Sequence, residues 1–321
     1  MILAKGKRTW QFKALTDLWT GSVTLEERHG QIKEKTGPGR LITTGLLGSI
    51  RWWFEVLVRG LGGYACDPTG TKCEGQNHCV VCELFGCTGW ARKFRFEVLD
   101  KAGKLKTDQI KTGDPFQFHF TPLRPIQKEE WMLLDLTLRL ITGYGAIGGK
   151  TVFKPTDESS RASKLHHKDY GLVQMTTSQQ FDGTGRGDLE IYLSKWRKPN
   201  DDDFAWASLR HFWCVNGKYL ARQDGNTSTF NHVIGRPEPK QQSGQNDSWI
   251  AGRRPDRRNN IEAESKKVFS FKNPARTFGF VKPNFAEIKT LLRKAWPDLQ
   301  DTDFHEGPAI LDDLLPKEDR P

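Results

Sequence analysis

Five of the six cysteines fall between residues 66 and 87, and four of them have spacings that suit a metal site. The order is Cys66-x6-Cys73-x5-Cys79-x2-Cys82, and a CxxC pair lets one backbone turn present both sulfurs to a tetrahedral zinc ion. His78 is a substitute ligand in the same segment. Because only the last pair has a standard spacing, free thiols or a disulfide are the alternative. We expect a structural zinc ion and no cofactor that is required for activity.

A predicted helix over residues 45–61 carries basic and aromatic residues side by side. Its apolar residues recur with a period near 3.6, which indicates one buried face that includes Trp53. Arg51 lies off that face and Trp52 lies at its boundary, so Arg51 is placed to contact a phosphate and Trp52 to stack on a base. The alternative is that both tryptophans are core residues and that Arg51 pairs with Glu55 four positions later.

Residues 143–151 are rich in glycine, which lets a backbone approach a sugar-phosphate chain closely, and Lys150 adds a positive charge. The segment is not a nucleotide-binding P-loop, because the first glycine of GxxxxGK[ST] would fall on Tyr144. It also follows a predicted helix, whereas a P-loop follows a strand. The alternative is a turn that binds no ligand.

Basic residues cluster beside aromatic residues over residues 90–96, so one strand could present cations to phosphate on one face and aromatic side chains to the core on the other. Arg92, Lys93 and Arg95 are therefore candidate phosphate contacts, and the alternative is an ordinary solvated strand face.

His166 and His167 are further candidates for RNA contact or for a cleavage base, which would need a partner and a placed phosphate. The chain contains no GxSxG, HExxH or clear carboxylate triad, and this favours binding over hydrolysis.

These residues must be positioned by alternating strands and helices. Period-two alternation predicts strands, and period-3.6 spacing predicts helices, in the order βαββαβ of the ferredoxin-like plan. The predicted elements of the first half are strands at 9–16, 93–99, 115–120 and 171–175 and helices at 45–61 and 129–141. Those of the second half are helices at 201–213 and 285–296 and strands at 267–271 and 276–281, after a connection at 177–200.

The length of 321 residues suits two domains. We predict an α+β protein with two ferredoxin-like (RRM-like, βαββαβ) domains in tandem, each with a loop insertion. The predicted domains are residues 1–180, with a Cys-rich insertion at 64–88, and residues 181–321, with a long basic loop at 235–262.

The formal net charge of +10 makes polyanions the natural partners. No apolar run approaches the roughly 18 to 20 residues of a membrane span, and no secretory signal is found at the N-terminus. We expect a cytoplasmic protein with no membrane partner.

Short motifs in the chain resemble the RAMP superfamily, and within it subunit one of the Cmr effector complex of type III-B CRISPR systems. Residues 48–54 (Gly-Ser-Ile-Arg-Trp-Trp-Phe) are similar to the family's serine-isoleucine-arginine helix, and residues 84–89 to its leucine-phenylalanine-glycine turn. Arg95-Phe96, the glycine-rich segment and residues 278–281 follow in the expected order. The resemblance implies two ferredoxin-like domains, other Cmr subunits as partners and a role in holding guide or target RNA for antiviral defence. It does not imply cleavage, because another subunit of such complexes cuts.

We therefore expect a non-catalytic, RNA-binding protein. Its predicted RNA contacts are Arg40, Arg51, Trp52, Arg92, Lys93, Arg95, Lys150, His166 and His167. One alternative is a metal-independent endoribonuclease that uses His166 or His167, and another is a basic scaffold that binds only protein partners.

Overall fold

The computed structural model divides the chain into two compact units. The first comprises Met1–Lys150, Tyr170–Arg210 and Pro308–Pro321, and the second Thr151–Asp169 and His211–Gly307. The residues that the structure describes are 6–21, 23–28, 31–36, 39–66, 73–149, 155–177, 179, 181, 184–198, 204–224, 227–235, 249–253, 255, 259, 262–282 and 284–315.

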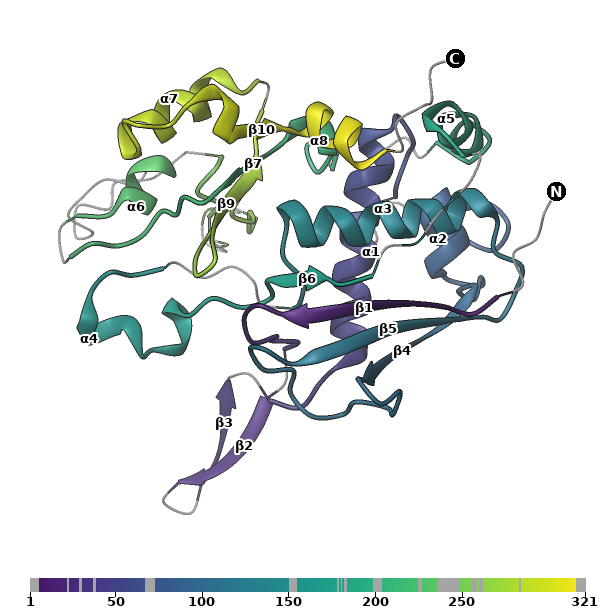
Figure 1. The fold of residues 1–321 in the computed structure, drawn as a ribbon, viewed down its shortest axis with the longest axis horizontal. Helices are drawn as coiled ribbons and strands as arrows, with labels where there is room; N and C mark the ends of the chain where they lie inside the picture. Colours follow the sequence, from purple (N-terminus) through teal and green to yellow (C-terminus); the bar gives the residue numbers. More distant parts are fainter. Residues whose placement is uncertain are drawn as a thin grey trace. The chain divides into compact units, whose positions relative to one another are not determined.

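The first unit is built on a four-stranded antiparallel sheet with the order β4-β5-β1-β6. Its strands are β1 (Arg8–Ala14), β4 (Phe94–Asp100), β5 (Pro115–Pro122) and β6 (Val173–Met175). Apolar residues alternate along β1, β4 and β5, so one face of the sheet is buried and the other carries polar side chains. The buried face is rich in phenylalanine, and helices α1 (Thr43–Gly60) and α3 (Lys128–Tyr144) belong to the same unit and contact each other and the sheet (Figure 1).

Shorter elements complete the first unit. The chain between β1 and α1 forms a hairpin of β2 (Val23–Arg28) and β3 (Gln31–Thr36), which projects away from the sheet (Figure 1). The helices α2 (Val80–Phe85), α5 (Arg186–Ser194) and α8 (Gly307–Leu314) are the remaining elements. Helix α5 is tied to α3 by the hydroxyl of Tyr192, which donates to the carboxylate of Glu130 over 2.9 Å.

The second unit has its own four-stranded antiparallel sheet, with the order β10-β7-β9-β8. Its strands are β7 (Phe212–Asn216), β8 (Val268–Lys272), β9 (Ala275–Phe280) and β10 (Phe304–Glu306). Its helices are α4 (Ser159–Ala162), α6 (Thr229–Val233) and α7 (Ala286–Ala295), with 3-10 turns η1 (Leu165–His167) and η3 (Asp301–Asp303), and a third turn η2 (Leu209–His211) runs into β7. Trp213, Phe230, Ile288 and Phe304 share one apolar core.

The predicted α+β class is confirmed by two four-stranded antiparallel sheets with helices, but two predicted segments are wrong. Residues 177–200 contain helix α5 instead of being only a connection. The helix predicted over residues 201–213 does not form in the residues that are described, where a short 3-10 turn leads directly into strand β7. Helix α1 begins at Thr43, with Ile42 at its N-cap position.

The compact units differ from the predicted division at residue 180. Residues 151–169 cluster with the second unit, whereas 181–210 and the end of the chain cluster with the first. The end of the chain belongs to the first unit because α8 contacts α3, where Arg139 donates a hydrogen bond to the carbonyl of Leu314. Most of the predicted basic loop at 235–262 lies outside the described residues. No helix of the described chain is long and apolar enough to cross a membrane.

Candidate functional site

Arg51 lies on α1 with its guanidinium group pointing to partners inside the first unit. It donates to the carboxylate of Glu55 over 3.1 Å, to the carbonyl of Gly86 over 2.9 Å and to the sulfur of Cys82 over 3.4 Å. Its side chain is 23% exposed. The alternative weighed in the sequence, a pair with Glu55, is therefore what the structure contains. Three of the five N–H donors of Arg51 are used within the protein, and its contact with a phosphate stays a prediction.

Gly86 explains why the leucine-phenylalanine-glycine turn accompanies this arginine. Its φ of +87° is in the left-handed region, and a Cβ atom there would lie 2.8 Å from the nitrogen of Arg92 and 2.9 Å from the oxygen of Trp90. Its N–H donates to the carbonyl of Cys82, and its own carbonyl is left to receive Arg51. The turn is thus shaped to accept a guanidinium from α1.

Two other residues of α1 hold the glycine-rich segment. The indole N–H of Trp53 donates to the carbonyl of Ala146 over 2.8 Å, and the N–H of Gly148 donates to the hydroxyl of Ser49 over 3.2 Å. The N–H of Ile147 and that of Gly149 donate to backbone carbonyls elsewhere in the unit. These amides already have acceptors within the protein. Close approach of the segment to a sugar-phosphate chain stays a prediction.

Trp52 lies half-buried beside Trp53, and the two rings meet edge to face with centroids 4.9 Å apart. Part of its aromatic surface is thus used inside the protein. Stacking of Trp52 on a base stays a prediction. Lys150, the only cation predicted for the glycine-rich segment, lies outside the described residues.

Lys93 was predicted to be accessible to a phosphate, but the structure buries it. It is 5% exposed, it forms an ion pair with Glu83, and its ammonium donates to both oxygens of Glu130 over 2.8 and 3.0 Å. Burial raises the pKa of the Glu130 carboxyl, although Lys93 and Tyr192 act in the opposite direction. Lys93 lies just before β4 and not within it, which is why it leaves the face that Arg95 occupies. Its charge is part of a buried network.

The other predicted cations of the first unit are accessible. Arg40 is exposed, Arg92 is half-buried, and the side chain of Arg95 is 57% exposed, with Glu97 as a surface partner at 3.2 Å. Sequence reasoning missed Arg124, whose guanidinium lies 4.3 Å from the centre of the Trp90 ring. The signal for it was available, because strand pairing places residues 121–124 beside residues 93–95.

His166 and His167 lie in the 3-10 turn η1 of the second unit, with ring centroids 4.2 Å apart. His166 is exposed and His167 is half-buried. They belong to a different compact unit from Arg51 and Arg95, and their contact with RNA stays a prediction.

The four predicted metal ligands do come together. The sulfur atoms of Cys66, Cys73, Cys79 and Cys82 all lie within 4.8 Å of one another, and all four residues are buried. His78 is not part of this set. Its ring nitrogens face the carboxylate of Glu83 at 2.7 Å and the carbonyl of Gly75 at 2.5 Å.

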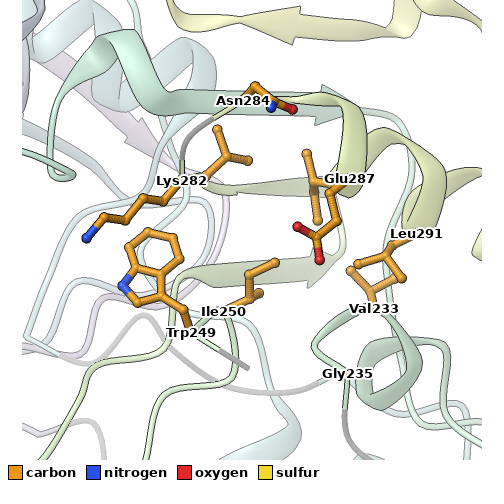
Figure 2. Close-up of a pocket in the computed structure, with 10 residues that line it drawn as sticks. Val233, Gly235, Trp249, Ile250, Lys282, Asn284, Glu287 and Leu291 are labelled. Atoms are coloured by element: carbon orange, nitrogen blue, oxygen red, sulfur yellow. The ribbon is translucent and has the colours of Figure 1, made fainter. Parts of the chain in front are cut away.

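The second unit contains a pocket of about 390 Å³ at the start of α7 (Figure 2). Its walls are mostly apolar and include Trp249 and Ile250, and Lys282, Asn284 and Glu287 supply its polar groups. Its described lining residues include no histidine, cysteine or hydroxyl side chain.

The fold and these contacts define an α+β protein with two four-stranded antiparallel sheets, whose first unit is organised by buried charged residues on α1 and before β4. Residues 11–153 match the family model of the RAMP superfamily. This match agrees with the resemblance to the RAMP superfamily that the motifs of the sequence indicated, and it covers the part of the chain that contains helix α1, the 84–89 turn and the glycine-rich segment.

Two solved structures are similar to the chain at low identity. One is Cmr1 from Pyrococcus furiosus in its apo form, with 10% identity, a TM-score of 0.40 and 97% of each chain covered. The other is a chain of a type IV-B CRISPR complex, with 14% identity, a TM-score of 0.33, and coverage of 56% of this chain and 93% of that one. No curated protein matches the chain.

The buried network predicts a large effect for Lys93→Ala. Loss of the ammonium leaves Glu83 and Glu130 as neighbouring carboxylates without their shared cation, so the free energy of unfolding should fall by about 3–5 kcal/mol. Arg95→Ala, two residues further along, is the control and should change it by no more than about 0.5 kcal/mol. Urea denaturation of both variants measures this, and similar midpoints for the two would contradict the buried role of Lys93.

The close packing of Gly145 on Trp53 predicts that two substitutions there will have non-additive effects on the free energy of unfolding. A Cβ at Gly145 would lie 2.5 Å from Cζ2 of Trp53, so Gly145→Ala should lower the free energy of unfolding by about 1–3 kcal/mol. Gly143→Ala is the control, because nothing lies within 4 Å of its Cβ. Combining Gly145→Ala with Trp53→Phe should cost less than the sum of the two single changes. Strict additivity in a thermal or urea unfolding cycle would show that the two positions are not in contact.

Proposed function

We propose that this chain is a non-catalytic RNA-binding subunit of a type III-B CRISPR (Cmr) ribonucleoprotein effector complex, where it holds guide or target RNA in antiviral defence. The observation that carries the proposal is the match of residues 11–153 to the RAMP superfamily. The motifs at residues 48–54 and 84–89 support the narrower assignment to Cmr subunit one. The partners are RNA and the other subunits of the complex.

The topology supports two ferredoxin-like domains in tandem as part of this proposal. From the first to the last strand of each sheet, strands and helices follow one another in the order βαββαβ, once the β2–β3 hairpin and the short helix α2 of the first unit are set aside as insertions. In each sheet, the first and third of these four strands are central, and the second and fourth are at the edges. Both features belong to the ferredoxin-like plan, which many RNA-binding modules use.

Charge supports a polyanionic partner. The formal net charge is +10, and buried pairs such as Lys93 with Glu83 and Glu130 contribute nothing positive to it. The excess must therefore be carried by other residues, and exposed arginines can donate two parallel hydrogen bonds to a phosphate. An RNA-binding role uses this excess, whereas a scaffold for protein partners does not require it.

The described surface that best suits RNA is a patch of Arg92, Arg95 and Arg124 at the start of β4, which we call the β4 patch. Strand β4 is at an edge of its sheet, and the N–H groups of Leu123 and Arg124 both donate to the carbonyl of Lys93. This keeps Arg124 close to Arg92. The Arg124 guanidinium covers the Trp90 ring, so a planar cation and an aromatic surface lie together beside two further cations.

The β4 patch can be tested by RNA binding to the full chain at several salt concentrations. The double variant Arg92→Ala/Arg95→Ala should bind single-stranded RNA more weakly at physiological salt. The slope of log affinity against log salt should fall by about 1.4 if each arginine contacts one phosphate. Arg293→Ala is the control, because it removes an exposed arginine that is paired with Asp301 in the second unit. Unchanged affinity and slope would remove the β4 patch, and no RNA binding by the wild-type chain would favour the protein-scaffold reading.

The non-catalytic part of the proposal is tested separately at the histidine pair. Labelled RNA incubated with the chain in EDTA should stay intact, and the His166→Ala and His167→Ala variants should give the same full-length RNA as the wild type. The reason is that acid–base cleavage needs a phosphate placed between two groups with defined roles, and adjacent rings in one exposed turn supply no such placement. Defined fragments that disappear in either variant would establish the endoribonuclease alternative.

A further inference from the structure

The sulfur atoms of the cysteine cluster converge on one point instead of lying in pairs. All four lie within 4.8 Å of one another, and those of Cys66 and Cys82 are 3.4 Å apart. A disulfide would bring two sulfurs to about 2.05 Å and leave the others outside. Four sulfurs at about 2.3 Å from a tetrahedral zinc ion are separated by about 3.8 Å, which is within the range seen.

The local chain explains how four cysteines reach one point. Cys79 is the N-cap of α2 and Cys82 lies in its first turn, so the helix start presents both sulfurs on one side. Cys66 follows the end of α1, and the N–H of Cys79 donates to the sulfur of Cys73 over 3.4 Å. Ligands from both ends of the insertion therefore meet at the junction of two helices.

Two arginines are directed at these sulfurs. Arg51 donates to the sulfur of Cys82 over 3.4 Å, and Arg197 donates to the sulfur of Cys73 over 3.6 Å and to the carbonyl of Asn77 over 3.2 Å. A guanidinium group has only donors, and a neutral thiol is a weak acceptor, so this arrangement suits thiolates. A zinc ion with four thiolates has a net charge of −2, which two guanidinium groups offset.

We propose that Cys66, Cys73, Cys79 and Cys82 bind a structural zinc ion and that Arg51 and Arg197 stabilise its thiolate ligands. With four protein ligands the site is closed to substrate, so its role is to fix the structure. The ion joins the end of α1 to the start of α2, and Arg51 extends this connection to Gly86. The proposal does not depend on RNA binding and would stand if the proposed function failed.

Metal analysis of the full chain tests the ligands. The wild type, grown with zinc, should retain about one zinc per chain, and Cys79→Ser and Cys82→Ser should each lose it. Cys87→Ser and Cys214→Ser are the controls and should retain it. Cys87 is the neighbouring cysteine outside the cluster, and burial raises the pKa of Cys214 to about 12 in the second unit. A wild type without zinc, or with iron in its place, overturns the assignment.

A second measurement covers the case in which the serine variants do not fold. The wild type is unfolded with a chelator and its thiols are counted: six reactive thiols are expected from a zinc site, and fewer would show a disulfide and overturn the proposal. Cobalt should replace zinc in the native chain with the visible absorption bands of tetrahedral thiolate coordination. Absence of those bands in a chain that still folds would also overturn it.

The arginines are tested by competition for zinc with a chromogenic chelator. Arg51→Met and Arg197→Met should each lower zinc affinity by about 10–100-fold, as loss of a group that hydrogen-bonds a metal ligand commonly does. Arg186→Met is the control, because Arg186 pairs with Glu190 and Asp312 away from the sulfurs. Zinc affinity equal to the wild type in both test variants would remove the arginines from the proposal.

Discussion

Buried polar groups need partners, and in the first unit α1 supplies partners for two separate loops. Arg51 donates to the carbonyl of Gly86, and Trp53 donates to that of Ala146. A buried donor or acceptor without a partner costs about 1–3 kcal/mol, so each loop is fixed to the helix by a contact that is expensive to lose. The two loops are far apart in the sequence, and each is held by a side chain of the same helix. This constraint gives the serine-isoleucine-arginine-tryptophan motif a structural role that aromatic and basic composition alone does not reveal.

The strands of the first unit could be predicted where only one face is buried, because β1, β4 and β5 then alternate between apolar and polar residues. Helix α3 is buried on most sides, and it could still be predicted because Trp131, Leu134, Leu138 and Ile141 recur at helical spacing. Strand β7 could not be predicted in this way, because four of its five residues are buried and the period-two signal is lost. Its aromatic residues, together with Phe204 and Leu209, fall at spacings of three to five that resemble a helix. Burial on both faces, not weak propensity, is the cause of that error.

Some features of the candidate site could likewise be predicted from the sequence, and others could not. The cysteine cluster was visible because ligand spacing is a local property, and the four residues occupy only 17 positions, from Cys66 to Cys82. The environment of Lys93 was not visible, because one of its carboxylate partners, Glu130, lies 37 positions away on a helix. A sequence shows that a residue is charged, but only the fold shows whether an opposite charge is beside it. For this reason Lys93 and Arg95 were given one role, and the structure separates them.

This separation affects how RNA binding should be understood in the chain. All three N–H groups of Lys93 already have carboxylate acceptors, so an RNA phosphate would have to compete with partners that are held in place at no further entropic cost. Arg51 uses three of its five N–H groups within the protein. Arg92 and Arg95 have no such buried pair, and the one ion pair at Arg95 is exposed and therefore weak. The buried cations stabilise the framework, and the exposed ones are available for a polyanion. The Lys and Arg residues of a basic chain can therefore stabilise the fold or bind a polyanion, and burial distinguishes the two groups.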